Sequence, residues 1–315
     1  MNEMRLLFVE PSLSDNGCGL SDRSFYERCV LCPRACGADR LSGKRGFCGM
    51  TSELRIARVG LHMWEEPCLS GTRGSGTIFF TGCNLGCRFC QNHDISRRIL
   101  PGRVFSISEL VQAMLDLQEK GAHNINFVTG THYVPHIIEG VRLARASGLT
   151  IPTLYNCGGY ESVDTMRALE GTIDIYLPDM KFFSGEISKK FANVTDYFEK
   201  AKDALEEMVR QCPEQIMDQE GMMKRGVIVR HLMLPGLLFD TKHILDYLCE
   251  AYGNRITISL MNQYTPMPDA PAELASPLSP KHYDSMVNYL SILGQENAYT
   301  QEGGTVSSSF IPDFQ

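Results

Sequence analysis

The sequence lacks three features that would place it in other classes of protein. No stretch approaches the roughly 18 consecutive apolar residues of a membrane-spanning helix, and the start lacks the long apolar stretch of a signal peptide. Basic residues are not in excess either, since 30 Lys and Arg stand against 37 Asp and Glu, a net charge of -7. This acidic balance argues against a nucleic-acid-binding surface. We therefore expect a cytoplasmic protein that binds neither membranes nor nucleic acids.

The chain is, by contrast, long and rich in cysteine. Its 315 residues suffice for one large domain, or for one domain with a small appendage, and 43% hydrophobic residues are ordinary for a globular protein. Twelve cysteines would indicate disulfides in a small secreted protein. Here most of them gather in two compact clusters, which is typical of metal ligands in a reducing compartment.

Three cysteines follow an apolar run with the spacing Cys-x3-Cys-x2-Cys: Cys83, Cys87 and Cys90. Thiolates are the usual ligands of iron–sulfur clusters, so three in one loop can hold three irons of a cubane. Because a fourth cysteine is missing locally, one iron stays open for a substrate or cofactor. Gly82 and Gly86 allow the backbone to turn sharply around the thiols. A zinc knuckle, which usually needs four paired ligands, or a set of inert buried thiols is the alternative.

From Gly76 onward, short β-type runs alternate with amphipathic helical stretches. We predict strands at 77–81, 124–129, 150–155, 173–177, 226–233 and 255–261. We predict helices at 108–120, 135–147, 162–170, 187–212, 241–251 and 281–293. Most of these strands are apolar on both faces, as in parallel sheets covered by helices. Six such β–α units imply an α/β fold with a parallel sheet and right-handed crossovers.

Residues 1–75 differ from this α/β region, which spans 76–294. They are rich in Gly and Cys and have little periodicity, so we interpret them as an appendage that needs a metal or the larger region for support. Four of their cysteines have the spacing of a metal site: Cys29, Cys32, Cys36 and Cys48. Zinc and a second iron–sulfur cluster both fit these thiols. Residues 295–315 form a polar tail.

The Cys83, Cys87 and Cys90 spacing resembles the signature of the radical S-adenosylmethionine (SAM) enzymes. The resemblance implies a [4Fe–4S] cluster on these three thiols, SAM at the open iron, and Phe89 against the adenine. It also implies that the parallel sheet curls into a partial (β/α)6 barrel of the TIM type, with chemistry at the carboxyl ends of the strands.

Polar residues after the later strands extend this resemblance. Asp179 and Lys181 match the Asp-x-Lys signature of glycyl-radical-enzyme activases, in which both face SAM and the Asp helps to bind a monovalent cation. Arg230 begins an Arg-x4-Pro-Gly turn like that on the fifth strand of the family. Gln263 and Tyr264 match the sixth-strand segment that contacts the ribose. The resemblance thus implies a SAM site built from several strand ends.

One motif of the family is replaced in this chain. Where members generally carry Gly-Gly-Glu-Pro after the second strand, the sequence has Thr129, Gly130, Thr131 and His132. We expect this backbone to bind the SAM amino group, with Thr131 or a neutral His132 in the side-chain role. A core or capping histidine is the alternative. Asn156 stands where the activases carry an acidic residue, so we expect contact with the cation or the ribose there.

The combined motifs resemble those of radical SAM proteins described as pyruvate formate-lyase activating enzymes, over roughly residues 25–290. The resemblance implies a radical SAM oxidoreductase that cleaves SAM to a 5′-deoxyadenosyl radical and abstracts hydrogen from a glycine of a partner glycyl-radical enzyme. It further implies a flavodoxin- or ferredoxin-type electron donor. Two alternatives stay open: a radical SAM enzyme for a small molecule or another peptide, and a non-enzymatic iron–sulfur or zinc electron-transfer protein. Cys18, Cys68 and Cys157 have no assigned role.

Overall fold

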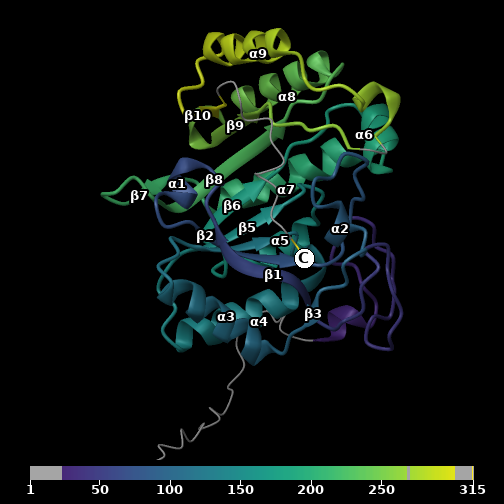
Figure 1. Cartoon of the computed structure of the whole chain (residues 1–315), viewed down its shortest axis with the longest axis vertical. Coiled ribbons are helices and arrows are strands. Elements are labelled where there is room, and N and C mark those ends of the chain that lie inside the picture. The colour runs from purple at the N-terminus through teal and green to yellow at the C-terminus, as the bar shows by residue number, and fades with distance from the viewer. Residues whose placement is uncertain (1–22, 268–269, 302–313, 315) are drawn as a thin grey trace, which may run out of the picture.

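The computed structural model describes residues 23–267, 270–301 and 314. One sheet runs through this part of the chain in the order β10-β9-β8-β6-β5-β4-β2-β1-β3, and β7 pairs with β8 (Figure 1). Neighbours are parallel from β10 to β2, and β1 is antiparallel to both β2 and β3. The strands are β1 (Arg55–His62), β2 (Ser75–Phe80), β3 (Arg103–Val104), β4 (Ile125–Val128), β5 (Thr153–Cys157), β6 (Ile175–Pro178), β7 (Ile216–Met217), β8 (Met223–Leu232), β9 (Thr257–Met261) and β10 (Ala298–Thr300).

The predicted fold class is confirmed: the six predicted strands are β2, β4, β5, β6, β8 and β9, and they are parallel. The prediction of a tail from 295 is wrong for Ala298–Thr300, because these residues pair with β9 as a further parallel strand. Among the described strands, β10 and β3 end the sheet without pairing to each other. The result is a partial barrel of the TIM type, not a closed one.

Helices pack in pairs on the outside of this sheet, α3 with α4, α5 with α7, and α8 with α9 (Figure 1). α3 begins at a capping box, in which the Ser106 hydroxyl accepts from the Glu109 amide and the Glu109 carboxylate accepts from the Ser106 amide. The α-helices are α1 (Pro67–Ser70), α2 (His93–Ser96), α3 (Ile107–Glu119), α4 (Val134–Ala146), α5 (Val163–Ala168), α6 (Gly185–Ala192), α7 (Tyr197–Gln211), α8 (Leu238–Ala251) and α9 (Pro280–Ile292). Short 3₁₀ segments are η1 (Arg23–Tyr26), η2 (Thr131–Tyr133), η3 (Gly253–Arg255) and η4 (Ala272–Leu274).

The single helix predicted at 187–212 is two helices, α6 and α7. Asn193 ends α6 in the left-handed conformation, with φ of 57°. Asn is one of the few residues that adopt this conformation at low cost, so the turn is local chemistry that an apolar stripe does not reveal. The apolar stripe of this segment continues across the break, because Phe191 of α6 and Leu205 of α7 are both buried in the same core.

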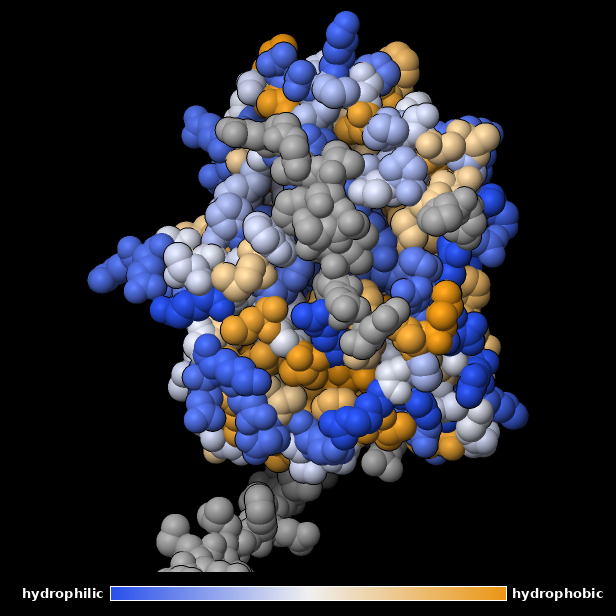
Figure 2. Space-filling model, viewed as in Figure 1, coloured by the Kyte–Doolittle hydropathy of each residue, from blue (hydrophilic) through white to orange (hydrophobic). Residues whose placement is uncertain are grey.

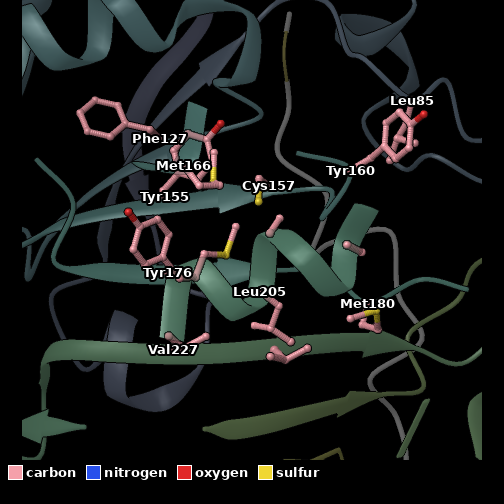
Figure 3. Packing of buried hydrophobic residues seen from close by; sticks show 14 of the residues in the cluster. Leu85, Phe127, Tyr155, Cys157, Tyr160, Met166, Tyr176, Met180, Leu205 and Val227 are labelled. Atoms are coloured by element: carbon pink, nitrogen blue, oxygen red, sulfur yellow. The ribbon is translucent and has the colours of Figure 1, made fainter. Parts of the chain in front are cut away.

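The main core lies between the strands and the outer helices. Strand side chains that point outward alternate with those that point into the barrel, as in any strand. Figure 3 shows part of this core, formed by strand and helix side chains: Phe127, Tyr155, Tyr176, Val227, Met166 and Leu205. The outward face is therefore sealed, and the inward face is left for a binding site.

The region before residue 76 is joined to the barrel more closely than the sequence predicts. β1 pairs with the whole of β2, from Ile56 opposite Phe80 to His62 opposite Ser75. Apolar side chains gather on the face over β1, whose residues other than Ile56 are half-buried (Figure 2). The boundary drawn at residue 75 thus falls within one sheet. Among the described residues, none of the helices is long and apolar enough to cross a membrane.

Candidate active site at the carboxyl end of the barrel

A cavity of about 480 Å³ extends from the carboxyl ends of the parallel strands into the barrel. Its lining includes Cys83, Cys87 and Cys90 from the loop after β2, so the structure brings the three predicted cluster ligands to one space. Further lining residues come from the ends of β4, β5, β6, β8 and β9. This is the edge at which catalytic residues of TIM-type barrels gather.

The loop that carries the three thiols is shaped by two glycines. Gly82 and Gly86 adopt φ of 89° and 81°, values that other residues rarely take, as the sequence predicted. The Leu85 amide donates to the Cys83 Sγ at 3.4 Å. The Ser96 hydroxyl donates to the Cys90 Sγ at 3.4 Å. Donors aimed at sulfur favour the thiolate form that metal binding requires.

The donor set suits a cluster better than a single ion. Within the described part of the chain, no group of three or more His, Cys, Asp or Glu side chains is close enough to hold one metal ion. A zinc ion draws its ligand sulfurs to about 2.3 Å from one point. A cubane instead takes each cysteine at a separate iron, so the thiols stand around a space. Three thiols around one cavity fit the second arrangement.

The pKa values of two of the thiols depend on burial and on one nearby lysine. Burial raises the pKa of Cys83 to about 11 and that of Cys87 to about 12, and the Lys181 ammonium opposes both shifts. Without metal these thiols are therefore protonated at neutral pH. Binding of iron must release the protons, which links metal affinity to pH.

Asp179 and Lys181 form an ion pair on the wall of the cavity, with 2.5 Å between the Asp179 Oδ2 and the Lys181 Nζ. Burial acts to lower the pKa of Lys181, but the Asp179 carboxylate outweighs it and raises that pKa above the ordinary value. The lysine is thus charged. The carboxylate that the resemblance assigns to a monovalent cation already has an ammonium partner in this structure.

The segment that replaces the family's Gly-Gly-Glu motif presents backbone to the cavity. Thr129 lines the cavity and has φ of 60°, a strained value for a β-branched residue. Gly130 is buried behind it. Such a backbone position is available to bind a ligand without a particular side chain.

The side chains of Thr131 and His132 are held elsewhere. The Thr131 hydroxyl donates to the Glu161 Oε1 at 2.8 Å, and the His132 Nε2 lies 2.8 Å from the Thr81 carbonyl oxygen. Burial, aided by Arg40, lowers the pKa of His132 to about 3. The histidine is neutral, as expected, but it is a core residue and does not line the cavity.

Of the other residues expected at SAM, most line the cavity. Phe89 does so and packs edge-on against Phe182 with ring centroids 5.8 Å apart, and Asn156 and Gln263 also do so. Tyr264 does not: it is fully buried, and its hydroxyl donates to the Leu274 carbonyl at 2.5 Å.

Arg230 also lines the cavity, but two carboxylates occupy it. Its guanidinium donates to Glu66 at 2.6 and 2.7 Å and also to Glu65. Sequence reasoning missed these two glutamates, which lie before the apolar run of β2. Two adjacent acidic residues before Pro67 could have indicated a charged site in the sequence. Nothing in the local sequence indicates that Arg230 is their partner.

The second cysteine set lies away from the cavity. None of its thiols lines that space: Cys29, Cys32, Cys36 and Cys48. They are neighbours, since the Cys29 and Cys36 thiols both act on the pKa of Cys48, which burial raises. Cys36 is exposed, and Arg40 donates to the Cys29 Sγ at 3.6 Å. A metal on this set stays a prediction.

The chain is similar to known proteins in sequence and in fold. A family model described as the radical SAM superfamily matches residues 77–248. A protein of Methanocaldococcus jannaschii, described only as uncharacterised, is 30% identical over 267 residues, which are 83% of this chain and 72% of that one. Methylornithine synthase (PylB) has a TM-score of 0.48 at 15% identity, covering 69% of this chain and 68% of its own. Streptococcus suis SuiB bound to the precursor peptide SuiA has a TM-score of 0.48 at 11% identity, covering 72% and 48%.

Proposed function

Because the chain belongs to the radical SAM superfamily, which implies a [4Fe–4S] cluster and SAM, we propose that Cys83, Cys87 and Cys90 bind three irons and that the cavity beside them binds SAM. When bound, the reduced cluster would supply one electron to SAM, which would split into methionine and a 5′-deoxyadenosyl radical that takes a hydrogen atom from a substrate C–H bond. The observation that carries this proposal is the meeting of the three thiols with polar strand-end residues around one cavity.

The residues of the chain bind and orient the ligand and exclude water. Phe89 offers a ring edge for the adenine, and Asn156 and Gln263 offer amide groups for the ribose. The Thr129 backbone N–H donates to the Asn156 carbonyl oxygen, so the Thr129 carbonyl is the backbone group that would accept from the amino group. Lys181, charged and paired with Asp179, lies near Cys87 and lowers the cost of placing negative charge there.

We assign the hydrogen donor to a glycine of a partner glycyl-radical enzyme. The Asp-x-Lys pair on the cavity wall supports this assignment, because the activases carry the same pair at the same strand end. The electron donor would be of the flavodoxin or ferredoxin type, in a reducing cytoplasm. A radical SAM enzyme for a small molecule or another peptide is the second candidate. The ion cluster of Glu65, Glu66 and Arg230 on the cavity wall favours it.

The test is reductive cleavage of SAM. Protein reconstituted with iron and sulfide without oxygen, then given SAM and dithionite, should release 5′-deoxyadenosine slowly even without substrate. Cys83→Ala, Cys87→Ala and Cys90→Ala should each reduce the product to background. Cys212→Ala is the matched control, since this buried thiol lies outside the cavity and should leave cleavage intact. A fully loaded cluster that leaves SAM whole would point to an electron-transfer protein.

A second assay separates the substrates. A candidate glycyl-radical enzyme added to the active mixture should develop the electron paramagnetic resonance doublet of a glycyl radical. Cleavage without that signal, across the glycyl-radical enzymes of the same cell, would favour the small-molecule or peptide substrate.

A further inference from the structure

The inner part of the cavity is lined by a charged layer that the proposed SAM chemistry does not use. It consists of Glu65 and Glu66, which follow β1, and Arg230, which points inward from β8. Their side chains are 6%, 5% and 14% exposed. Residues 164 positions apart in the sequence thus share one buried ion cluster.

The layer lies directly above an apolar floor. Cys68 and Leu69 of α1 pack in the barrel against buried strand residues, including Ile228. Since side chains alternate along a strand, Arg230 shares the inward face of β8 with Ile228 on one side and with Leu232, which lines the cavity, on the other. The layer therefore forms the bottom of the cavity, with the thiol loop at its mouth.

Acidic groups outnumber basic groups in this layer. Burial acts to raise the pKa of Glu66, but Arg230 outweighs it and holds that pKa below the usual range, so Glu66 is ionised at pH 7. His62 also lines the cavity, and burial lowers its pKa, so it adds no positive charge there. The pair of Asp179 and Lys181 is neutral as a whole. Two carboxyl groups thus face one guanidinium in this layer.

A buried acceptor beside the layer also lacks a donor. Asn126 of β4 is fully buried, and its Nδ2 donates to the Glu65 Oε1 at 2.8 Å. Its Oδ1 has no hydrogen-bond partner within the described part of the chain. Val128, on the same face of β4, lines the cavity. An unsatisfied buried acceptor is costly, so the polar contacts of Asn126 are not all met inside the protein, although Asn126 itself does not line the cavity.

We propose that Glu65 and Glu66 bind a protonated amine of the substrate at the bottom of the cavity, with Asn126 holding the Glu65 carboxyl group in place. An ammonium group carries one positive charge and three donors, and the layer offers two carboxyl groups against one guanidinium. Buried ion clusters of this kind are rarely kept for stability, because well-packed apolar residues do as well. The inference rests on the second candidate of the proposed function, a small molecule or another peptide as substrate, and places the amine end of that substrate below the SAM site.

The tryptophan content of the chain makes direct binding measurable. Trp64 is its single tryptophan, adjoins Glu65 and lines the same cavity. Fluorescence of the cluster-free protein can therefore be titrated with Nα-acetyl-lysine amide and with its uncharged match, Nα-acetyl-norleucine amide. A second pair, pentylamine and pentanol, presents the same ammonium group without a peptide backbone. Tighter binding of the lysine probe than of pentylamine indicates a peptide source, and the reverse order indicates a small amine.

The expected result is that each amine binds at least ~10-fold more tightly than its uncharged match, as for a hydrogen bond to a charged partner. Glu65→Gln and Glu66→Gln should each remove most of this preference, because each removes one of the two carboxyl groups that would bind the amine and leaves the other for Arg230. Glu139→Gln makes the same charge change on the surface of α4 and should preserve the preference. Equal affinities for the charged and uncharged probes in the unmutated protein would overturn the inference without any variant. So would a preference that survives in both glutamine variants with their melting temperatures unchanged.

The outcome is independent of SAM cleavage, because the titration needs neither cluster nor SAM. Amine preference without SAM cleavage would keep the subsite and reject the proposed chemistry. SAM cleavage without amine preference would keep the proposed chemistry and reject the subsite.

Discussion

The chain has two cysteine-rich loops, and their surroundings differ. The loop with Cys83, Cys87 and Cys90 follows a parallel strand, and all three thiols face one cavity. The loop with Cys29 to Cys48 lies outside that cavity, and its side chains contact buried arginine and aromatic groups. Thiol spacing alone therefore does not define a site, because the surroundings of the thiols determine what they can bind.

The second loop is nevertheless attached to the first at several points. Arg34 donates to four backbone carbonyls at 3.0–3.3 Å, two in the thiol loop and two at the end of α6: Asn84, Leu85, Ala192 and Asn193. A Cβ on Gly82 would lie 2.8 Å from the Cys48 carbonyl oxygen, so the two loops touch there. The outer loop thus braces the inner one.

Metal analysis gives the sharpest test of the comparison. We propose that Cys29, Cys32, Cys36 and Cys48 bind zinc or a second cluster independently of the other set. A variant with Cys83, Cys87 and Cys90 all replaced by alanine should lose the iron of the barrel mouth entirely and retain the metal of the outer loop. Elemental analysis of protein purified without oxygen measures both. Neither zinc nor iron in that variant would make the outer loop a purely structural element.

Removing Arg40, the buried arginine of the outer loop, should have the largest effect on stability. Arg40 is fully buried and donates to the Met50, Thr51 and His132 carbonyls at 3.2, 2.8 and 2.7 Å. Arg40→Met leaves these three acceptors without their donor, and at about 1–3 kcal/mol each we expect a loss of at least ~3 kcal/mol in the free energy of unfolding. Urea denaturation measures it.

The control for this variant is Arg45→Met, at an exposed position of the same loop. Its effect should stay within about 0.5 kcal/mol. Similar losses in the two variants would mean that the outer loop does not depend on its buried arginine.

Arg34→Ala should affect the thiol loop more than the whole fold. We expect a loss of about 1–3 kcal/mol in the free energy of unfolding. SAM cleavage should fall by ~10-fold or more, because small displacements of a reacting group are costly. Lys44→Ala, an exposed cation nearby, should change neither quantity. Unchanged cleavage in the Arg34 variant would show that the thiol loop holds its shape without the brace.

A further expected effect depends on pH and concerns Glu161, which is buried beside Thr131. Burial raises its pKa to about 8, against an ordinary 4.5, although the Thr131 and Tyr155 hydroxyls donate to it. The folded protein thus keeps a proton that the unfolded chain releases, so this stabilisation is complete below pH 4.5 and is lost as the pH rises toward 8. Glu161→Gln should gain stability relative to the unmutated protein between pH 5 and 8, and no further above. Parallel curves of melting temperature against pH would contradict this.

Local features of the sequence determined much of this protein. The strands and the thiol motif are continuous segments of the sequence. Periodicity therefore predicted six parallel strands, and spacing predicted the loop at Cys83, Cys87 and Cys90. The Asp179 and Lys181 pair was also found, because two charges at a strand end point to the same edge of a sheet. Even the glycine turns followed from single residues.

The tertiary structure alone decided where distant side chains meet. Thr131 and His132 follow a strand in sequence, yet their hydrogen bonds hold them in the core, while Thr129 faces the cavity. β10 has too few residues to show a period, and pairing with β9 makes it a strand. Glu66 and Arg230 are joined across 164 residues because the curvature of the sheet directs both into the barrel. Such contacts depend on how strands close around a common space, which no local pattern of residues specifies.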